Sequence, residues 1–267
     1  MHEKADAPLD PTALSRALAG SLFGGAIEHH RLIDSTNWHA AELAAAGAPE
    51  GLVVLAEEQS AGRGRLGRRW LAPAGSALLC SLVLRPRLDP RSLHRLTMIA
   101  TLSAAEAIGE LHTLPVEIKW PNDLLLHGRK VGGMLCEAAL QGHTLRHVVL
   151  GLGINVNLAP STLGEVLIPA ASLSDALGHP VPRAALLVAL LRRFEQYYVK
   201  INAGWLPVDA WRARLATLGQ NVEVGTPEGL VTGVAEDVDG DGALLVRTPS
   251  GKLVTILAGD VTLRGRS

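Results

Sequence analysis

Apolar positions along the first 218 residues follow two periods, and together they predict an α+β domain. Helical spacing of apolar residues predicts amphipathic helices, and short apolar or alternating runs between turn residues predict strands. The predicted helices span residues 11–20, 38–46, 91–112 and 183–203, and the last is expected to continue to residues 211–214. The predicted strands span residues 27–33, 52–56, 77–84, 116–120, 124–126, 131–139 and 146–155.

The pattern changes from residue 220 onward. Short β-branched runs at residues 221–224, 230–237, 243–248 and 252–257 are separated by turns rich in Gly, Pro and Asp. Such a series predicts a small antiparallel barrel. We therefore predict two domains, residues 1–218 and residues 219–267.

One turn in this second domain has the first residues of a calcium-binding loop. Asp237, Asp239, Asp241 and Gly242 have the right spacing, but the twelfth position is Thr248. A calcium loop needs a bidentate Glu there and helices on both sides. The flanking runs are strand-like, so we predict a hairpin turn.

Residues 62–70, with the sequence GRGRLGRRW, carry the strongest chemical signal. Four arginines lie among three glycines, and no Asp or Glu occurs from residue 59 to residue 88, although the net charge is only -1. Glycines at positive φ let backbone N–H groups approach a phosphate, arginines donate to its oxygens, and Trp70 can stack on a base. Neither a Walker loop nor a dinucleotide fingerprint matches. On the residues alone, a nucleotide phosphate site, a nucleic-acid surface and a solvated basic loop stay open.

Composition narrows the class of protein. The 267 residues are 48% hydrophobic and 19% charged, as in ordinary globular proteins, and the balanced charge argues against a general polyanion binder. The polar first ten residues do not have the form of a signal peptide, and the apolar residues 96–111 are too short to span a membrane. We therefore expect a cytoplasmic protein with no membrane or nucleic-acid partner.

The cysteines and histidines give no sign of a metal site. Cys80 and Cys136 are far apart, each within an apolar run, and are predicted to be reduced core residues. The ten histidines, His29 and His30 among them, show no metal-ligand spacing. No metal ligand is assigned from the sequence.

Five motifs in a fixed order resemble those of bacterial biotin protein ligases. They are STN at residues 35–37, Gln59 with GRGRLGRRW at 62–70, KWPND at 119–123, RKVGG at 129–133 and GLGINVN at 151–157. The resemblance implies a mixed β-sheet flanked by helices, like that of class II aminoacyl-tRNA synthetases, with a C-terminal SH3-like barrel. It also implies that biotin is activated by ATP to biotinyl-5′-AMP and transferred to a lysine of a biotin carboxyl carrier domain. ATP, Mg²⁺ and biotin are the ligands expected from this resemblance.

The resemblance assigns roles to residues within these motifs. Catalytic roles fall on Arg63, Arg65, Lys119 and Lys130. Biotin binding falls on Ser35, Thr36, Asn37, Gln59, Arg63, Gly64, Arg65, Lys130, Gly132 and Gly133. Adenylate binding falls on Arg65, Arg68, Trp70, Asn122, Lys130 and Asn155. The cations suit a step in which a carboxylate attacks a phosphate, because two anions meet there. Ser35 and Thr36 also suit a helix N-cap, which is compatible with binding.

Alternatives remain beside this hypothesis. A lipoate–protein ligase shares the fold and chemistry, but its loop has a different arrangement of Arg and Gly. A nucleic-acid-binding protein is disfavoured because acids outnumber bases in residues 220–260. Only 34 residues precede Ser35, so we expect a ligase without an N-terminal DNA-binding repressor domain. An exposed sheet edge would allow a homodimer.

Overall fold

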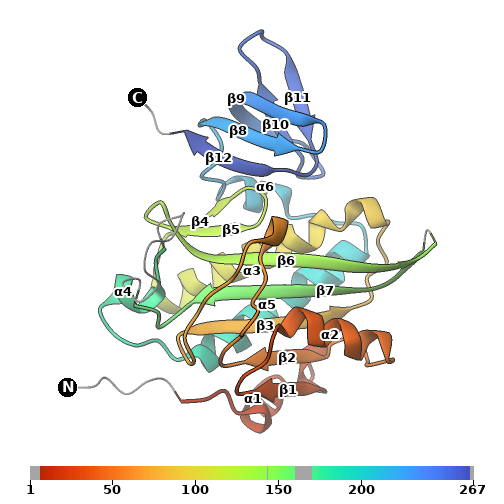
Figure 1. Ribbon diagram of the computed structural model, residues 1–267, viewed down its shortest axis with the longest axis vertical. Helices are drawn as coiled ribbons and strands as arrows, with labels where there is room; N and C mark the ends of the chain where they lie inside the picture. The colour runs from red at the N-terminus through yellow and green to blue at the C-terminus, as the bar shows by residue number, and fades with distance from the viewer. Residues whose placement is uncertain (1–6, 143, 160–169, 265–267) are drawn as a thin grey trace.

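A seven-stranded mixed sheet forms the centre of the larger part of the molecule (Figure 1). The computed structural model describes residues 7–142, 144–159 and 170–264, so the first six of the ten N-terminal residues lie outside it. The strands are β1 (Ile27–His30), β2 (Val53–Ala56), β3 (Ala77–Leu84), β4 (Val116–Lys119), β5 (Asp123–Leu126), β6 (Arg129–Gln141) and β7 (Thr144–Asn155). Their order is β1-β2-β3-β7-β6-β5-β4, with β1 and β2 parallel and the other neighbours antiparallel.

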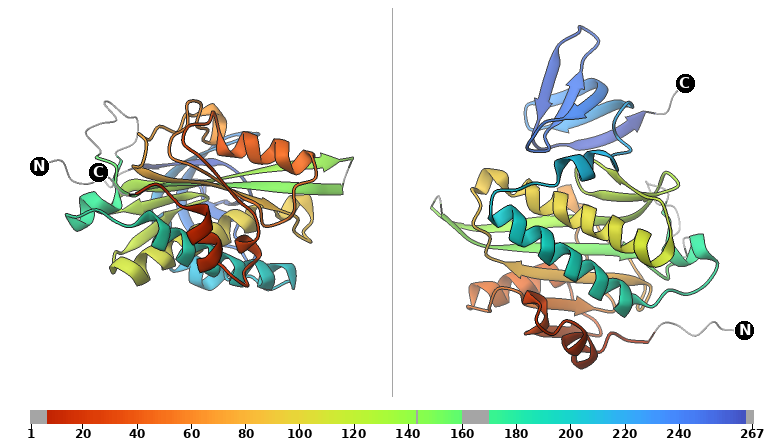
Figure 2. Two further views of the ribbon diagram at one scale, coloured as in Figure 1. Left: turned by 90° about the horizontal axis from the view of Figure 1, so that it is seen from below. Right: turned by 180° about the vertical axis from the view of Figure 1, so that it is seen from behind.

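Helices cover both faces of this sheet (Figure 2). The long helices α3 (His94–His112) and α5 (Arg183–Asn202) lie on one face, and α2 (Thr36–Ala45) lies on the other. Shorter helices are α1 (Pro11–Ala17), α4 (Leu173–Leu177) and α6 (Val208–Arg212), with 3₁₀ turns at Leu22–Gly24, Arg65–Gly67 and Pro90–Ser92. Because the centre of the sheet is covered on both sides, all eight residues of β3 are buried. This explains why β3 is a continuous apolar run in the sequence.

Several predicted boundaries differ from the structure. The helix predicted to continue to residues 211–214 ends at Asn202, because Gly204 takes a φ of +89° and Pro207 lacks the N–H of a continuing helix. Helix α2 begins at Thr36, two residues before the prediction. Strands β6 and β7 are longer than predicted. Their outer ends pair in an exposed hairpin whose residues do not follow the apolar pattern used for the prediction.

The C-terminal part is a five-stranded antiparallel sheet. Its strands are β8 (Asn221–Thr226), β9 (Gly229–Val238), β10 (Leu244–Arg247), β11 (Leu253–Ile256) and β12 (Asp260–Arg264), in the order β11-β10-β9-β8-β12. The small antiparallel unit is confirmed, and β12 is a strand that the prediction missed. The acidic turn between β9 and β10 is a hairpin, as predicted, in which Asp239 Oδ1 accepts hydrogen bonds from the N–H groups of Asp241 and Ala243.

Trp120 joins the two sheets. Its backbone N–H donates to Thr217 Oγ1 at 2.9 Å, and its buried indole Nε1 donates to the carbonyl of Gly242 at 3.0 Å. Gly242 approaches Met98 so closely that a Cβ there would lie 2.3 Å from Met98 Cε. The C-terminal sheet is therefore fixed beside β4 and β5, close to the KWPND motif (Figure 1).

The two cysteines do not form a disulfide bond in the structure. Cys80 and Cys136 are both free thiols, and burial raises their pKa values, that of Cys136 to about 12. Cys80 lies in the core, whereas Cys136 is partly buried against it, and their reduced state stays a prediction. In the part of the chain that the structure describes, no helix has the length and apolar character needed to cross a membrane.

Candidate active site

A cavity of about 430 Å³ opens on the face of the sheet that carries α2. Its volume lies in the range of small-molecule sites, which is about 300–1,000 Å³. The predicted residues that line it are Ser35, Thr36, Asn37, Gln59, Arg63, Gly64, Arg65, Arg68, Trp70, Asn122, Lys130, Gly133 and Asn155. Motifs up to 120 residues apart in the sequence thus meet at one place.

Two predicted residues are not part of this lining. Gly132 faces the opposite side of β6, where a Cβ would lie 2.9 Å from the Gly153 carbonyl oxygen and 3.1 Å from Leu124 Cδ1. Neighbouring strand residues point to opposite faces, so of the two glycines only Gly133 lies in the cavity lining, and the biotin-binding role of Gly132, expected through its backbone, stays a prediction. Lys119 lies on β4 opposite Asp123 of β5, half-buried. Burial lowers the pKa of Lys119, while the nearby carboxylates of Asp123 and Asp260 oppose this shift.

One end of the cavity is polar but uncharged. Gln59 Oε1 accepts hydrogen bonds from the backbone N–H of Thr36 at 2.7 Å and from Thr36 Oγ1 at 3.1 Å. Ser35 occupies the N-cap position of α2, yet its side chain makes no capping hydrogen bond. The hydroxyl of Ser35 is therefore not used by the helix, and it lies in the cavity lining.

Asn37 fixes the start of α2 against the sheet. Its Nδ2 donates to Glu137 Oε2 at 2.8 Å, and its Oδ1 accepts from Ser81 Oγ at 2.6 Å. A Cβ at Gly151 would lie 2.1 Å from Asn37 Oδ1. Gly151 is therefore needed so that the polar start of the helix can lie directly on β7.

The arginine loop folds back on itself above the cavity. Trp70 N–H donates to the Gly62 carbonyl at 2.9 Å, and Gly64 N–H donates to the Arg68 carbonyl at 2.7 Å. Of its three glycines only Gly67 has a positive φ, +73°, so the expectation of positive φ is wrong for Gly62 and Gly64. Gly62 is required for a different reason, because a Cβ there would lie 2.4 Å from the Trp70 carbonyl oxygen.

The tip of this loop contacts the C-terminal sheet. Arg65 donates to Asn122 Oδ1 at 2.8 Å and to the Gly259 carbonyl at 2.9 Å. Arg68 forms a two-armed ion pair with the Asp260 carboxylate. Burial lowers the pKa of Arg65, whereas the hydrogen bond to Asp260 raises the pKa of Arg68. The cavity is therefore bounded by both parts of the chain.

Two further cations and an aromatic ring complete the charged end. Lys130 Nζ lies 2.7 Å from Asp123 Oδ1, and Arg63 Nη2 lies 3.1 Å from Glu137 Oε1. Lys130 Nζ is also 5.8 Å from the centroid of the Trp70 ring. The ring lies on β7 at Gly153, where a Cβ would approach it to 2.9 Å. A flat apolar surface thus adjoins a cluster of Arg and Lys side chains that can donate hydrogen bonds to phosphate oxygens.

Comparison with known proteins agrees with this geometry. Residues 30–155 match the Biotin/lipoate A/B protein ligase family, and residues 217–264 match the Biotin protein ligase C terminal domain. A biotin–[acetyl-CoA-carboxylase] ligase of Mycobacterium tuberculosis is 36% identical over 263 residues, which cover 95% of each chain. The chain belongs to the biotin protein ligase family. It is accordingly a ligase enzyme.

Other members of the family support the assignment over the whole fold. A biotin–[acetyl-CoA-carboxylase] ligase of Paracoccus denitrificans is 38% identical, covering 83% of this ligase and 94% of the relative. A biotin protein ligase from Aquifex aeolicus, solved in complex with biotin and ATP, has a TM-score of 0.75 and 28% identity. That match covers 90% of this chain and 99% of the other.

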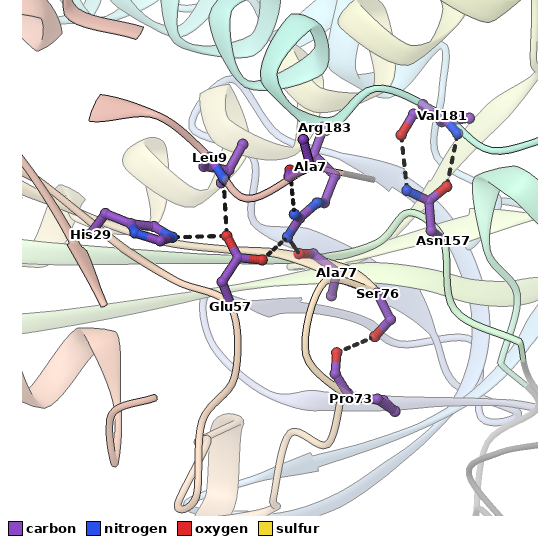
Figure 3. Close-up of polar contacts among 10 residues, drawn as sticks. All are labelled: Ala7, Leu9, His29, Glu57, Pro73, Ser76, Ala77, Asn157, Val181 and Arg183. Carbon is purple, nitrogen blue, oxygen red and sulfur yellow. Dashed lines mark hydrogen bonds and ion pairs between the residues drawn. The ribbon is translucent and has the colours of Figure 1, made fainter. Parts of the chain in front are cut away.

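A buried ion pair at the base of the ligase's arginine loop was not predicted (Figure 3). Arg183 Nη1 donates to Glu57 Oε2 at 2.7 Å, while Glu57 Oε1 lies 2.8 Å from His29 Nε2 and accepts from Leu9 N–H at 3.1 Å. The same guanidinium donates to the carbonyls of Ala7 and Ala77. Glu57 directly follows β2 and lies two residues before Gln59, which lines the cavity. The network therefore fixes the chain where it enters the cavity wall.

Sequence reasoning also missed three polar residues around the cavity. These are Ser81, Glu137 and Asp260. Glu137 gave a weak signal, as a charged residue within an otherwise apolar predicted strand. Ser81 lies inside an apolar run, and Asp260 is 192 residues from its partner Arg68, so the sequence alone offered no link to the site.

Proposed function

We propose that this ligase activates biotin with ATP to biotinyl-5′-AMP and transfers the biotinyl group to a lysine of a biotin carboxyl carrier domain. The observation that carries this proposal is the division of one cavity into an uncharged hydrogen-bonding end and a cationic end with a flat ring. These ends suit the neutral fused ring of biotin and a nucleotide. The Aquifex aeolicus ligase, which is 28% identical, was solved with biotin and ATP together, in support of this assignment.

The uncharged end suits the fused ureido ring of biotin. Ser35, Thr36 and Gln59 offer donors and acceptors for the ureido oxygen and N–H groups. Leu79 and Leu152 provide apolar lining on the sheet face for the ring and the aliphatic tail. Asn37 is held by Ser81 and Glu137, so we assign it to positioning the start of α2.

The cationic end suits the first chemical step. A carboxylate oxygen of biotin attacks the α-phosphorus of ATP, a new P–O bond forms, and pyrophosphate leaves with the electrons of the broken P–O bond. Negative charge gathers on the phosphoryl oxygens as two anions meet. Arg63, Arg65 and Lys130 are the donors that we assign to this charge, and we assign Arg68 to the departing pyrophosphate.

The adenine is assigned to the Trp70 face. Asn155, whose Nδ2 donates to the Ala171 carbonyl, offers an amide beside it. Both amide atoms of Asn122 are engaged, Oδ1 by Arg65 and Nδ2 with the Met134 carbonyl, so we assign Asn122 mainly to orienting Arg65. The nucleotide substrate is Mg-ATP, and the phosphate oxygens themselves supply the main ligands for its Mg²⁺.

The second step transfers the biotinyl group. The neutral amine of the acceptor lysine attacks the acyl carbon of biotinyl-AMP, the C–O bond to AMP breaks, and the amine loses a proton. Lys119 is a half-buried cation next to Asp123 and near this site. We propose that its charge favours the neutral form of the incoming amine, because nearby like charges lower an amine pKa.

Mass spectrometry of the acceptor tests the proposal. The ligase is incubated with Mg-ATP, a carboxyl carrier domain, and either biotin or lipoate. We expect biotinylation of one lysine, whereas lipoylation without biotinylation would favour the lipoate activity that the family also contains. Lys130→Ala should abolish pyrophosphate release while circular dichroism is unchanged, and Lys200→Ala on α5 is the matched control. Normal release by Lys130→Ala would remove this residue from the reaction.

Arg65 allows a second test of the same assignment. We expect Arg65→Gly to form biotinyl-AMP but to release it, so that lysines of an unrelated protein such as serum albumin are labelled. The reason is that Arg65 links the loop tip to Asn122 and Gly259; without these hydrogen bonds we expect the loop to open more readily and to enclose the intermediate less well. Retention of the intermediate equal to that of the unchanged ligase contradicts this role.

A further inference from the structure

Three side chains outside the cavity form a cluster at the edge of the main sheet. Glu28 and His30 alternate on the edge strand β1, so both point to the face on which α2 lies, and His39 projects from α2 toward them. One ligand atom from each residue lies within 4.8 Å of the other two. His29, between them, points to the other face and contacts Glu57.

Two of the three separations in this cluster are close to those between ligands around one small cation. His39 Nε2 lies 3.1 Å from Glu28 Oε2, and His30 Nε2 lies 3.5 Å from the same oxygen. In a tetrahedral zinc site the metal–ligand distances of about 2.0–2.2 Å place neighbouring ligand atoms about 3.3–3.6 Å apart. The two imidazole rings are edge to face, with centroids 4.7 Å apart.

A hydrogen-bonded cluster alone does not account for these atoms. Glu28 Oε2 faces both imidazoles, but only His39 is close enough for a good hydrogen bond. His30 Nε2 is shielded from solvent and has no hydrogen-bond partner among the described residues. Buried polar atoms in native proteins are nearly always paired, so an unpaired imidazole nitrogen directed toward a carboxylate points to a missing ligand.

We propose that Glu28, His30 and His39 bind a divalent transition-metal ion, with zinc as the expected ion. Two imidazoles and one carboxylate form a donor set that suits zinc and leaves one coordination position open for water. This proposal revises the expectation that no histidine is a metal ligand. The spacing Glu-x-His followed nine residues later by His does not match a recognisable metal-binding motif. The three ligands come together only when α2 packs on β1.

The position of the site gives it a structural role. The ion would link the edge strand β1 to α2, and the first residues of α2 are Thr36 and Asn37 in the cavity lining. Binding to the folded state and not to the unfolded chain raises stability. We therefore expect zinc to raise the unfolding temperature and to hold α2 in place at the open edge of the sheet.

Metal titration of the full, tag-free chain tests this site. After treatment with a chelator, calorimetric titration with Zn²⁺ should show one ion per chain, and Co²⁺ should give the visible absorption bands of four-coordinate cobalt. His30→Ala and His39→Ala should each weaken zinc binding by more than about tenfold. His179→Ala, at an exposed histidine elsewhere on the surface, is the matched control and should bind as the unchanged chain does.

Glu28→Gln separates metal binding from folding. The amide keeps the size of the side chain and can still hydrogen-bond to His39, so the variant should fold normally but lose the rise in unfolding temperature with zinc. The proposal is overturned if no saturable binding is found, or if zinc binds His30→Ala or His39→Ala as tightly as the control. These measurements involve neither biotin nor ATP, so their outcome is independent of the proposed enzymatic reaction.

Discussion

Two arginine–carboxylate ion pairs hold the segment of residues 57–70, and they differ in exposure to solvent. At its base Arg183 meets Glu57, and these side chains are 0% and 7% exposed. At its tip Arg68 meets Asp260, and these side chains are 49% and 26% exposed. Breaking a buried pair leaves an uncompensated charge, whereas an exposed pair adds little to stability. The base of the segment is therefore a fixed part of the fold, whereas the Arg68 pair adds little resistance to opening of the tip.

The largest expected effect is at the base. Arg183→Met should lower the free energy of unfolding by about 3–5 kcal/mol, because Glu57 would remain buried without its cation. Urea unfolding followed by circular dichroism measures this loss. Arg192→Met is the control on the same helix, since Arg192 is exposed and donates to the Ala17 carbonyl. A loss no larger than that of the control would contradict the contrast between base and tip.

Two glycines of the arginine loop give a matched test of packing. A Cβ at Gly62 would lie 2.4 Å from the Trp70 carbonyl oxygen, whereas one at Gly64 would lie 3.4 Å from its nearest neighbour, the Arg68 carbonyl oxygen. Gly62→Ala should therefore cost about 1–3 kcal/mol and displace Trp70, while Gly64→Ala should cost much less. Urea unfolding and Trp fluorescence measure both effects, and equal losses would refute the difference.

The pH dependence of stability should report on Glu57. Burial raises the pKa of Glu57, but the hydrogen bonds from His29, Leu9 N–H and Arg183 outweigh burial, so the net shift is downward. A lowered folded-state pKa contributes stability that is present above the unfolded-state value, about 4.3, and is lost as the pH falls through the folded-state value. The stability difference between the unchanged chain and Glu57→Gln should therefore shrink below about pH 4.3. A difference that grows in acid would be inconsistent with this shift.

The smallest effect is expected at the tip. Arg68→Ala should lower stability by about 0–1 kcal/mol, and added salt should reduce that loss, because the pair is partly exposed to screening ions. Urea unfolding at low and high salt measures it. A loss that does not change with salt would show that the tip resembles the buried base.

Local chemistry was visible in the sequence, and contacts across the chain were not. Arg63, Arg65 and Lys130 could be assigned to the site from the sequence. Each lies in a short motif whose neighbouring residues identify it. Asp260 and Arg183 contribute through contacts 192 and 126 residues apart, which only the folded topology creates. The domain boundary at residues 218 and 219 stays a prediction.

Two glycine positions show which geometry the sequence does not reveal. Gly132 and Gly133 are adjacent in the motif, but β6 turns them to opposite faces, so the binding role of Gly132 stays a prediction. Gly62 was expected to supply a positive φ, whereas the structure uses its missing Cβ for a close backbone contact. A glycine in a motif can indicate that no side chain fits at that position. The structure shows which neighbouring atoms exclude it.

Protein oxygens already occupy the cations of the cavity. Lys130 holds Asp123, Arg63 holds Glu137, and Arg68 holds Asp260. An anion that binds Lys130, Arg63 or Arg68 must therefore exchange with a carboxylate, and free phosphate or sulfate would gain little there by replacing one ionic contact with another. A nucleotide gains more, because its base also covers the Trp70 ring. We therefore expect the three paired carboxylates to disfavour small inorganic anions at these cations relative to a nucleotide.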